Sequence, residues 1–119
     1  MYQRHETGKW GEEKACEYLS KREYDIVEQN FSCSQGEIDI VAWDKNKNEL
    51  VFIEVKTRTN SNYGSPADAV DMPKQKHIYW AAQYYIYLHK IKNTYLRFDV
   101  LEIYVKGELY KINHIKQIF

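Results

Sequence analysis

The stretch GEIDIVAWDKNKNELVFIEVKTR, residues 36–58, decides the fold, because it reads as two β-strands joined by a short polar turn. Apolar and polar side chains alternate along residues 36–44 and again along residues 49–58, which is the period of strands that pack one face on a core. The run KNKN, residues 45–48, is polar throughout and separates the two. We therefore predict an antiparallel hairpin that turns over residues 45–48.

The register of this hairpin places charged side chains on one face. Antiparallel pairing around the turn puts Asp39 opposite Glu54 and Glu37 opposite Lys56. The same face carries the apolar side chains of Val41, Trp43, Leu50 and Phe52. The other face is expected to be core and carries Ile38, Ile40, Ala42, Val51, Ile53 and Val55.

Two carboxylates on neighbouring strands, Asp39 and Glu54, would have β-carbons only about 5 Å apart and would repel each other. A proton, a nearby cation or a bound metal must compensate, and Lys56 supplies one positive charge. Mg²⁺ also suits the pair, because it prefers one or two carboxylates plus water. The pattern therefore predicts metal-assisted hydrolysis, in which Lys56 orients or deprotonates the attacking water.

A plainer interpretation of the same residues is a solvated strand face, on which the pattern Glu-x-Lys is common. The apolar side chains that share the face with Asp39 and Glu54 favour a partly covered cleft. The hairpin by itself does not decide between the two interpretations.

The remaining elements are expected at residues 7–22 (helix), 25–30 (strand), 57–67 (loop), 72–91 (helix), 95–105 (strand) and 109–115 (strand). Thr7 and Asp71 are the candidate N-caps of the helices, and Pro73 lies in the first turn of the second. The order α-β-β-β-α-β-β predicts an α/β fold in which helices pack on a mixed sheet. A chain of 119 residues suits a single domain over residues 1–119.

Composition excludes several classes of protein. The 17 basic and 17 acidic residues cancel, which argues against a histone-like basic protein and against an acidic disordered tail. No apolar run approaches the roughly 18 residues of a membrane span, and residues 1–13 lack the apolar segment of a signal peptide. The two cysteines, Cys16 and Cys33, are too few for a disulfide scaffold, so a reduced cytoplasmic protein is expected.

Several strings in the sequence occur together and in a defined order. They are Gly11-Glu12, Asn30, GEIDIVA (36–42), VFIEVKTR (51–58), GSPADAV followed by Lys74 (64–74), and RFDV (97–100). Over about residues 8–105 the chain resembles the YraN family, a small bacterial family placed in the PD-(D/E)xK nuclease superfamily near the archaeal Holliday-junction resolvases.

This resemblance implies a restriction-endonuclease-like core of order α-β-β-β-α-β. It implies that Asp39, Glu54 and the backbone carbonyl of Val55 bind Mg²⁺ or Mn²⁺, that Lys56 is the catalytic lysine, and that Glu12 acts through a metal-bound water. The role of Glu37 is left open. The implied substrate is DNA, with branched or recombination intermediates as candidates, and a homodimer is expected by analogy.

Weaker candidates lie near the start of the second helix. Lys74, Lys76, His77 and Arg58 are candidates for phosphate contacts, and a solvated helix start explains them equally well. Three roles are open for the tyrosine-rich run in that helix: stacking on bases, a dimer contact, or ordinary packing in the core.

Two rival functions remain. One is a nucleic-acid-binding protein that keeps the nuclease-like fold without turnover, and the other is an interaction protein whose strand charges only confer solubility. The distribution of charge along the chain is relevant to whether the protein binds DNA. If one acidic site holds Glu12, Asp39, Glu54 and Glu37, the rest of the chain is mildly basic, and DNA binding should be weak without metal.

Overall fold

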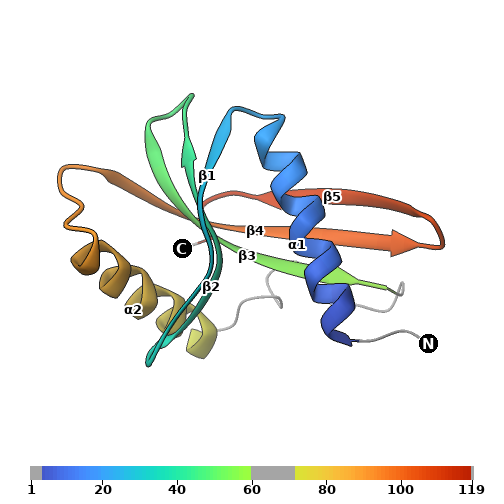
Figure 1. Cartoon of the computed structure of the whole chain (residues 1–119), viewed down its shortest axis with the longest axis horizontal. Coiled ribbons are helices and arrows are strands. Elements are labelled where there is room, and N and C mark those ends of the chain that lie inside the picture. Colours follow the sequence, from blue (N-terminus) through green and yellow to red (C-terminus); the bar gives the residue numbers. More distant parts are fainter. Residues whose placement is uncertain (1–3, 60–71, 119) are drawn as a thin grey trace.

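The computed structural model describes residues 4–59 and 72–118, and these contain two helices and five strands in the expected order. Figure 1 shows a sheet with one helix packed on each face. The elements are α1 (Arg4–Ser20), β1 (Tyr24–Cys33), β2 (Gly36–Asp44), β3 (Glu49–Arg58), α2 (Met72–Leu88), β4 (Tyr95–Lys106) and β5 (Leu109–Ile115).

The predicted and observed boundaries of the elements agree best where apolar and polar residues alternate most strictly. β2 and β3 span the residues predicted for them, and β4 and β5 agree to within one residue. The first helix differs, because it begins at Arg4, so Thr7 is an interior residue and its prediction as N-cap is wrong. This helix ends at Ser20 rather than at residue 22, and Glu23 adopts a left-handed φ of 67° directly before β1. β1 is longer than the predicted 25–30.

The second helix ends at Leu88, earlier than the predicted residue 91. Lys90 has a left-handed φ of 53°, and the backbone N–H of Ile91 donates to the carbonyl of Ile86 at 3.1 Å. This is the hydrogen-bond pattern that closes a helix with one left-handed residue. Neither helix, within the described ranges, is long and apolar enough to cross a bilayer.

The predicted loop over residues 57–67 overlaps the end of β3, because Thr57 and Arg58 pair with β4 as strand residues. Its part from residue 60 onward lies outside the described residues, as does Asp71, the predicted N-cap. Within the described residues the helix runs from Met72, and Pro73 lies in the first turn of this range, where the missing N–H costs no hydrogen bond.

The five strands form one sheet in the order β1-β2-β3-β4-β5. β3 and β4 are parallel, and all other neighbours are antiparallel. α2 lies in the connection between the two parallel strands and covers one face of the sheet, while α1 covers the other (Figure 1). Because both faces are covered, the central strands β3 and β4 are buried on both sides.

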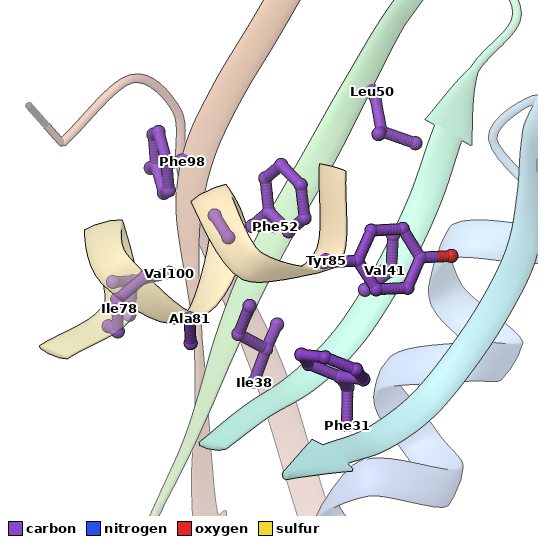
Figure 2. Packing of buried hydrophobic residues seen from close by; sticks show 11 residues of the cluster. Phe31, Ile38, Val41, Leu50, Phe52, Ile78, Ala81, Tyr85, Phe98 and Val100 are labelled. Atoms are coloured by element: carbon purple, nitrogen blue, oxygen red, sulfur yellow. The ribbon is translucent and has the colours of Figure 1, made fainter. Parts of the chain in front are cut away.

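The core under α2 is aromatic. Phe52 of β3 lies between the rings of Tyr85 and Phe98, with centroids 5.9 and 5.4 Å away (Figure 2). Further buried members of this cluster are Phe31, Ile38, Val41, Leu50, Ile78, Ala81, Ala82 and Val100. The core under α1 is aliphatic except for one tyrosine, and consists of Ala15, Leu19, Tyr24, Ile40, Ala42, Val51, Ile53, Leu101 and Ile103.

One residue of the hairpin packs on the face opposite to that predicted. Alternation placed Ile38 with Ile40, but Ile38 belongs to the cluster under α2 (Figure 2). The backbone ladder between β2 and β3 ends at the pair Ile40–Ile53, and beyond it β2 is paired with β1 alone. Freed from β3, the outer end of the hairpin lies beside α2 (Figure 1), which explains why Ile38 turns toward that helix.

A buried charge network ties β4 to three other strands on the α1 side. The guanidinium of Arg97 lies 2.8 Å from Asp44, 2.8 Å from Glu49 and 2.9 Å from Asp99. It also donates to the hydroxyl of Tyr24 at 2.6 Å. The guanidinium of Arg97 has five N–H donors in a planar arrangement, so it can bind all of these acceptors at once. This gives a structural role to the first residue of the RFDV string.

Asp99, the third residue of that string, has two further partners. Its Oδ2 lies 2.7 Å from Nε2 of His114 on β5, and its Oδ1 accepts from the backbone N–H of Gln117. Although burial alone would raise the pKa of Asp99, the hydrogen bonds from His114 and Arg97 hold it below its ordinary value. The network therefore stabilises an ionised carboxylate inside the fold.

Candidate functional site

Asp39 lies where β2 and β3 separate. Its Oδ2 accepts a hydrogen bond from the backbone N–H of Val55 at 2.8 Å. The β2–β3 ladder has already ended at Ile40–Ile53, so the Asp39 side chain satisfies a strand N–H that a neighbouring backbone would otherwise bind. The predicted register between β2 and β3 is therefore confirmed as far as the pair Ile40–Ile53. Asp39 contacts β3 through its side chain and is not a ladder partner of Glu54.

Glu54 is the most buried carboxylate of the site, with 6% of its side chain exposed, and two lysines contact it. Its Oε2 lies 2.9 Å from Nζ of Lys74, at the start of α2, and 3.3 Å from Nζ of Lys56, two residues along β3. Lys56 was expected to face Glu37 and to supply a positive charge to the carboxylate pair, and its ion pair with Glu54 confirms the second expectation. Lys74, expected at a phosphate, contacts a carboxylate.

Burial and neighbouring carboxylates both disfavour the ionised form of the carboxyls in this site. Burial and then the charge of Glu54 raise the pKa of Asp39 to about 8. Burial, followed by the charges of Glu37 and Glu54, also raises the pKa of Glu12. Burial alone would lower the pKa of Lys74, but its hydrogen bond to Glu54 and the charge of that residue raise it. A further cation in the site would oppose each of these shifts, because a nearby positive charge lowers the pKa of both carboxyl and ammonium groups.

These side chains open onto a cleft of about 460 Å³ between the sheet and α2. Its lining residues are Gly36, Glu37, Asp39, Glu54, Pro73, Lys74, His77 and Ile78. Gly36 has a φ of 156°, and a β-carbon on it would lie 3.3 Å from both the Cβ and the backbone oxygen of His77. The glycine therefore allows the turn between β1 and β2 to approach α2 and close one end of the cleft.

Glu12 approaches the same carboxylates from α1, on the opposite side of the sheet. Its side chain hydrogen-bonds to Asn30 on β1, and its charge contributes to the raised pKa of Asp39. α1 crosses β3 closely at Gly11, where a β-carbon would clash with Oγ1 of Thr57. The pair Gly11-Glu12 thus combines close helix–sheet contact with a carboxyl that acts on the site.

Two of the weaker candidates lie apart from the cleft lining. Nη2 of Arg58 lies 3.4 Å from Oε2 of the fully buried Glu102, so the arginine is engaged by a different carboxylate. Lys76 is exposed on α2, while His77 does line the cleft. Sequence reasoning missed Gly36 and Pro73 as wall residues and did not foresee Lys74 as a partner of Glu54.

The donor set suits a hard cation better than zinc. Among the described residues, no three His, Cys, Asp or Glu side chains are arranged to hold a metal ion. Asp39 and Glu54 provide two adjacent carboxyls. The N–H and C=O groups of a strand residue point to the same edge of the strand, so the carbonyl of Val55 points toward Asp39, as its N–H does. Mg²⁺ is characteristically held by one or two carboxylates and completed by water.

Comparison with known proteins identifies relatives along almost the whole chain. A family model described as "Uncharacterised protein family UPF0102" matches residues 11–103. A UPF0102 protein of Caldicellulosiruptor saccharolyticus is 47% identical over 116 residues, covering 96% of this chain and 97% of the relative. A UPF0102 protein of Caldanaerobacter subterraneus subsp. tengcongensis is 48% identical, covering 95% and 93%, and one of Clostridium perfringens is 43% identical, covering 94% and 92%.

Proposed function

The chain belongs to the UPF0102 (YraN) family, and for it we propose a metal-dependent endonuclease that hydrolyses phosphodiester bonds of DNA. One observation carries the proposal. Asp39 and Glu54 are adjacent carboxyls at a split between two strands, with Lys56 beside them and an open cleft above. A restriction-endonuclease-like core, implied by the resemblance, is consistent with the observed element order.

The residues present fit a divalent cation. Asp39, Glu54 and the carbonyl of Val55 would hold Mg²⁺ or Mn²⁺, and Glu12 would act through a water. When bound, such an ion neutralises a phosphate and lowers the pKa of a coordinated water. The raised pKa values of Asp39 and Glu12, caused first by burial and then by neighbouring carboxylates, support this, because a bound cation would favour the ionised form of both.

The chain's own residues then supply the rest of the chemistry. Lys56, on β3 next to Glu54, orients the attacking water and stabilises charge on the scissile phosphate. Lys74 and His77, at the start of α2, border the cleft and contact a flanking phosphate. The cleft is open to solvent and lined in part by charged side chains, which suits a DNA backbone that carries its charge on the outside.

The test is cleavage of synthetic four-way junctions, duplexes and single strands in the presence of Mg²⁺ or Mn²⁺. We expect cleavage by the wild-type protein, and its loss in Asp39→Asn and in Lys56→Ala. Matched controls are Asp25→Asn, on the exposed surface of β1, and Lys106→Ala, at the exposed end of β4, which should cut normally. A wild type that cuts no substrate, or site variants that cut as well as the controls, would refute the proposal.

A second candidate function is DNA binding without turnover. It is favoured by the two lysines on Glu54, which already neutralise this carboxylate without metal. It predicts salt-dependent DNA binding that persists in EDTA, and no calorimetric binding of Mn²⁺. Cleavage that depends on Asp39 would exclude it.

A further inference from the structure

Helix α2 exposes an aromatic surface that the proposed hydrolysis does not use. Its inward side, formed by Ile78, Ala81, Ala82 and Tyr85, is buried against the sheet. Its outward side carries Tyr79 (43% exposed), Trp80 (56%), Tyr84 (41%) and Tyr87 (77%). We call these four side chains the aromatic strip. Exposing so many large rings on one helix is unusual for a surface that meets only water.

The charged side chains of α2 and of the segment that follows it have one sign. Residues 72–98 contain no aspartate or glutamate, whereas Lys74, Lys76, Lys90 and Lys92 lie within them. Lys76 precedes Trp80 by one helical turn on the same exposed side, and Lys90 and Lys92 follow the end of the helix. One carboxylate of another element lies near the end of the helix, since Oε1 of Glu28 on β1 is 3.9 Å from Nε2 of His89. Rings on a helix that carries cations and no carboxylate of its own suit a ligand that has both flat faces and negative charge.

The strip is continuous with the cleft. Lys74 and His77 line the cleft, and Trp80 of the strip follows His77 by three residues, which makes the two side chains neighbours on the helix surface. From Lys76 to Tyr87 the helix advances about 16 Å, at 1.5 Å per residue. A strand that leaves the cleft along α2 would therefore meet a basic residue first and then successive rings.

We infer that the aromatic strip binds single-stranded DNA by stacking on its bases and guides that strand into the cleft. The inference rests on the proposed nuclease function and names its substrate as DNA with an unpaired segment. In a duplex the faces of the bases are stacked on one another, so exposed rings gain most from unpaired bases. Lys76 and Lys90 would contact phosphates of the same strand.

Charge argues against a second copy of the chain as the occupant of this surface. A two-fold interface places the same patch of two subunits face to face. The lysines of α2 would then meet their own counterparts, with no carboxylate in residues 72–98 to offset them. A polyanion has the complementary charge, and a second copy does not.

Binding can be tested apart from cleavage in the Asp39→Asn variant, in EDTA at low salt. The probe is a fluorescein-labelled oligothymidine, compared with a blunt duplex of the same length. We expect tighter binding of the single strand, and quenching of tryptophan fluorescence that is lost in Trp80→Phe. Tyr87→Ala should weaken single-strand binding by about five- to a hundredfold, as expected for the loss of one base–aromatic stack.

Tyr95→Ala is the matched control, because Tyr95 is 78% exposed, lies outside α2 and is as accessible as Tyr87. It should bind the single strand as tightly as the parent protein. Equal binding of duplex and single strand, or equal effects of Tyr87→Ala and Tyr95→Ala, would overturn the inference. So would sedimentation showing that Tyr87→Ala converts a dimer into a monomer while DNA binding is unchanged.

The two proposals fail in different experiments. Lack of cleavage by the wild type with Mg²⁺ or Mn²⁺ would refute the nuclease function without altering the metal-free binding measurement. Cleavage that depends on Asp39, combined with indifference to Tyr87 and Trp80, would instead refute the stacking surface alone.

Discussion

Nζ of Lys74, on α2, lies 2.9 Å from Oε2 of Glu54, on β3, and thereby joins the helix to the carboxylate pair on the sheet. A divalent cation at Asp39 and Glu54 would have to share Glu54 with this ammonium group. Lys74 therefore competes with metal for the carboxylate while it provides positive charge for a phosphate. The balance between these two effects can be measured.

We predict that Lys74→Met binds Mn²⁺ more tightly than the wild type, by up to about fivefold. The gain is small because Lys74 is 42% exposed, and partly exposed ion pairs contribute at most about 1 kcal/mol. Isothermal titration calorimetry measures the affinity, with Lys76→Met, an exposed lysine half a turn away, as control. Weaker Mn²⁺ binding by Lys74→Met would contradict competition at Glu54.

The metal-free protein should lose stability as the pH rises from about 4 to about 8. Burial and Glu54 raise the pKa of Asp39 from 3.8 to about 8, so the native state keeps a proton that the unfolded chain has released. Since the native state binds more protons in this interval, the free energy of unfolding falls with rising pH, by an amount on the order of a few kcal/mol.

Urea denaturation in EDTA across this pH range checks the prediction. Asp39→Asn cannot ionise and should show a flatter profile, whereas Asp25→Asn, at an exposed position, should follow the wild type. Identical pH profiles for wild type and Asp39→Asn would show that Asp39 titrates normally.

The close crossing of α1 and β3 predicts opposite effects for two glycines of one helix. In Gly11→Ala the new methyl group meets Oγ1 of Thr57, so α1 must shift away from β3 and carry Glu12 with it. In Gly8→Ala the methyl group has no atom within 4 Å, so helix propensity should raise the free energy of unfolding by up to about 1 kcal/mol.

Thermal unfolding and cleavage rates distinguish the two glycine variants. Gly11→Ala should lower both, and adding Thr57→Ala should restore part of the loss by removing the clashing atom. If Gly11→Ala behaves like Gly8→Ala, the side chain of Thr57 accommodates the methyl group by rotation and the crossing is not tight.

Removal of the buried cation at Arg97 should destabilise the fold strongly. Arg97→Met would leave Asp44 and Asp99 buried without their guanidinium partner, at a cost of about 3–5 kcal/mol. Arg97→Lys should recover only part of this, because an ammonium group has fewer donors than the planar fork. Chemical denaturation measures both variants, and a loss below about 1 kcal/mol for Arg97→Met would mean that the network contributes little.

The hairpin could be predicted from sequence because its information is local. Alternation over residues 36–44 and 49–58 fixed both strands and their register as far as Ile40–Ile53. Beyond that pair, local alternation fails, because the outer end of the hairpin follows α2 instead of β3. Ile38 consequently turned to the unexpected face, and Asp39 contacted Val55 through its side chain.

The partners of the charged residues depend on contacts between distant elements. Lys74 is 20 residues from Glu54 in sequence, and it reaches that carboxylate because α2 crosses between parallel strands and begins beside β3. Arg97 likewise gathers acceptors from β1, β2 and β3, which no periodicity reveals. Exposure of the aromatic strip also follows from packing, since Tyr85 is buried while Tyr84 and Tyr87 of the same run are not.

The sequence by itself determined the element order, the central hairpin and the residues Asp39, Glu54 and Lys56 as one cluster, because alternation and a short turn are properties of neighbouring residues. The tertiary structure alone decided where the strands separate, which lysines neutralise Glu54, and which helix face remains open to a ligand. These depend on where two helices pack on a twisted sheet, and a packing position is set by the whole core at once.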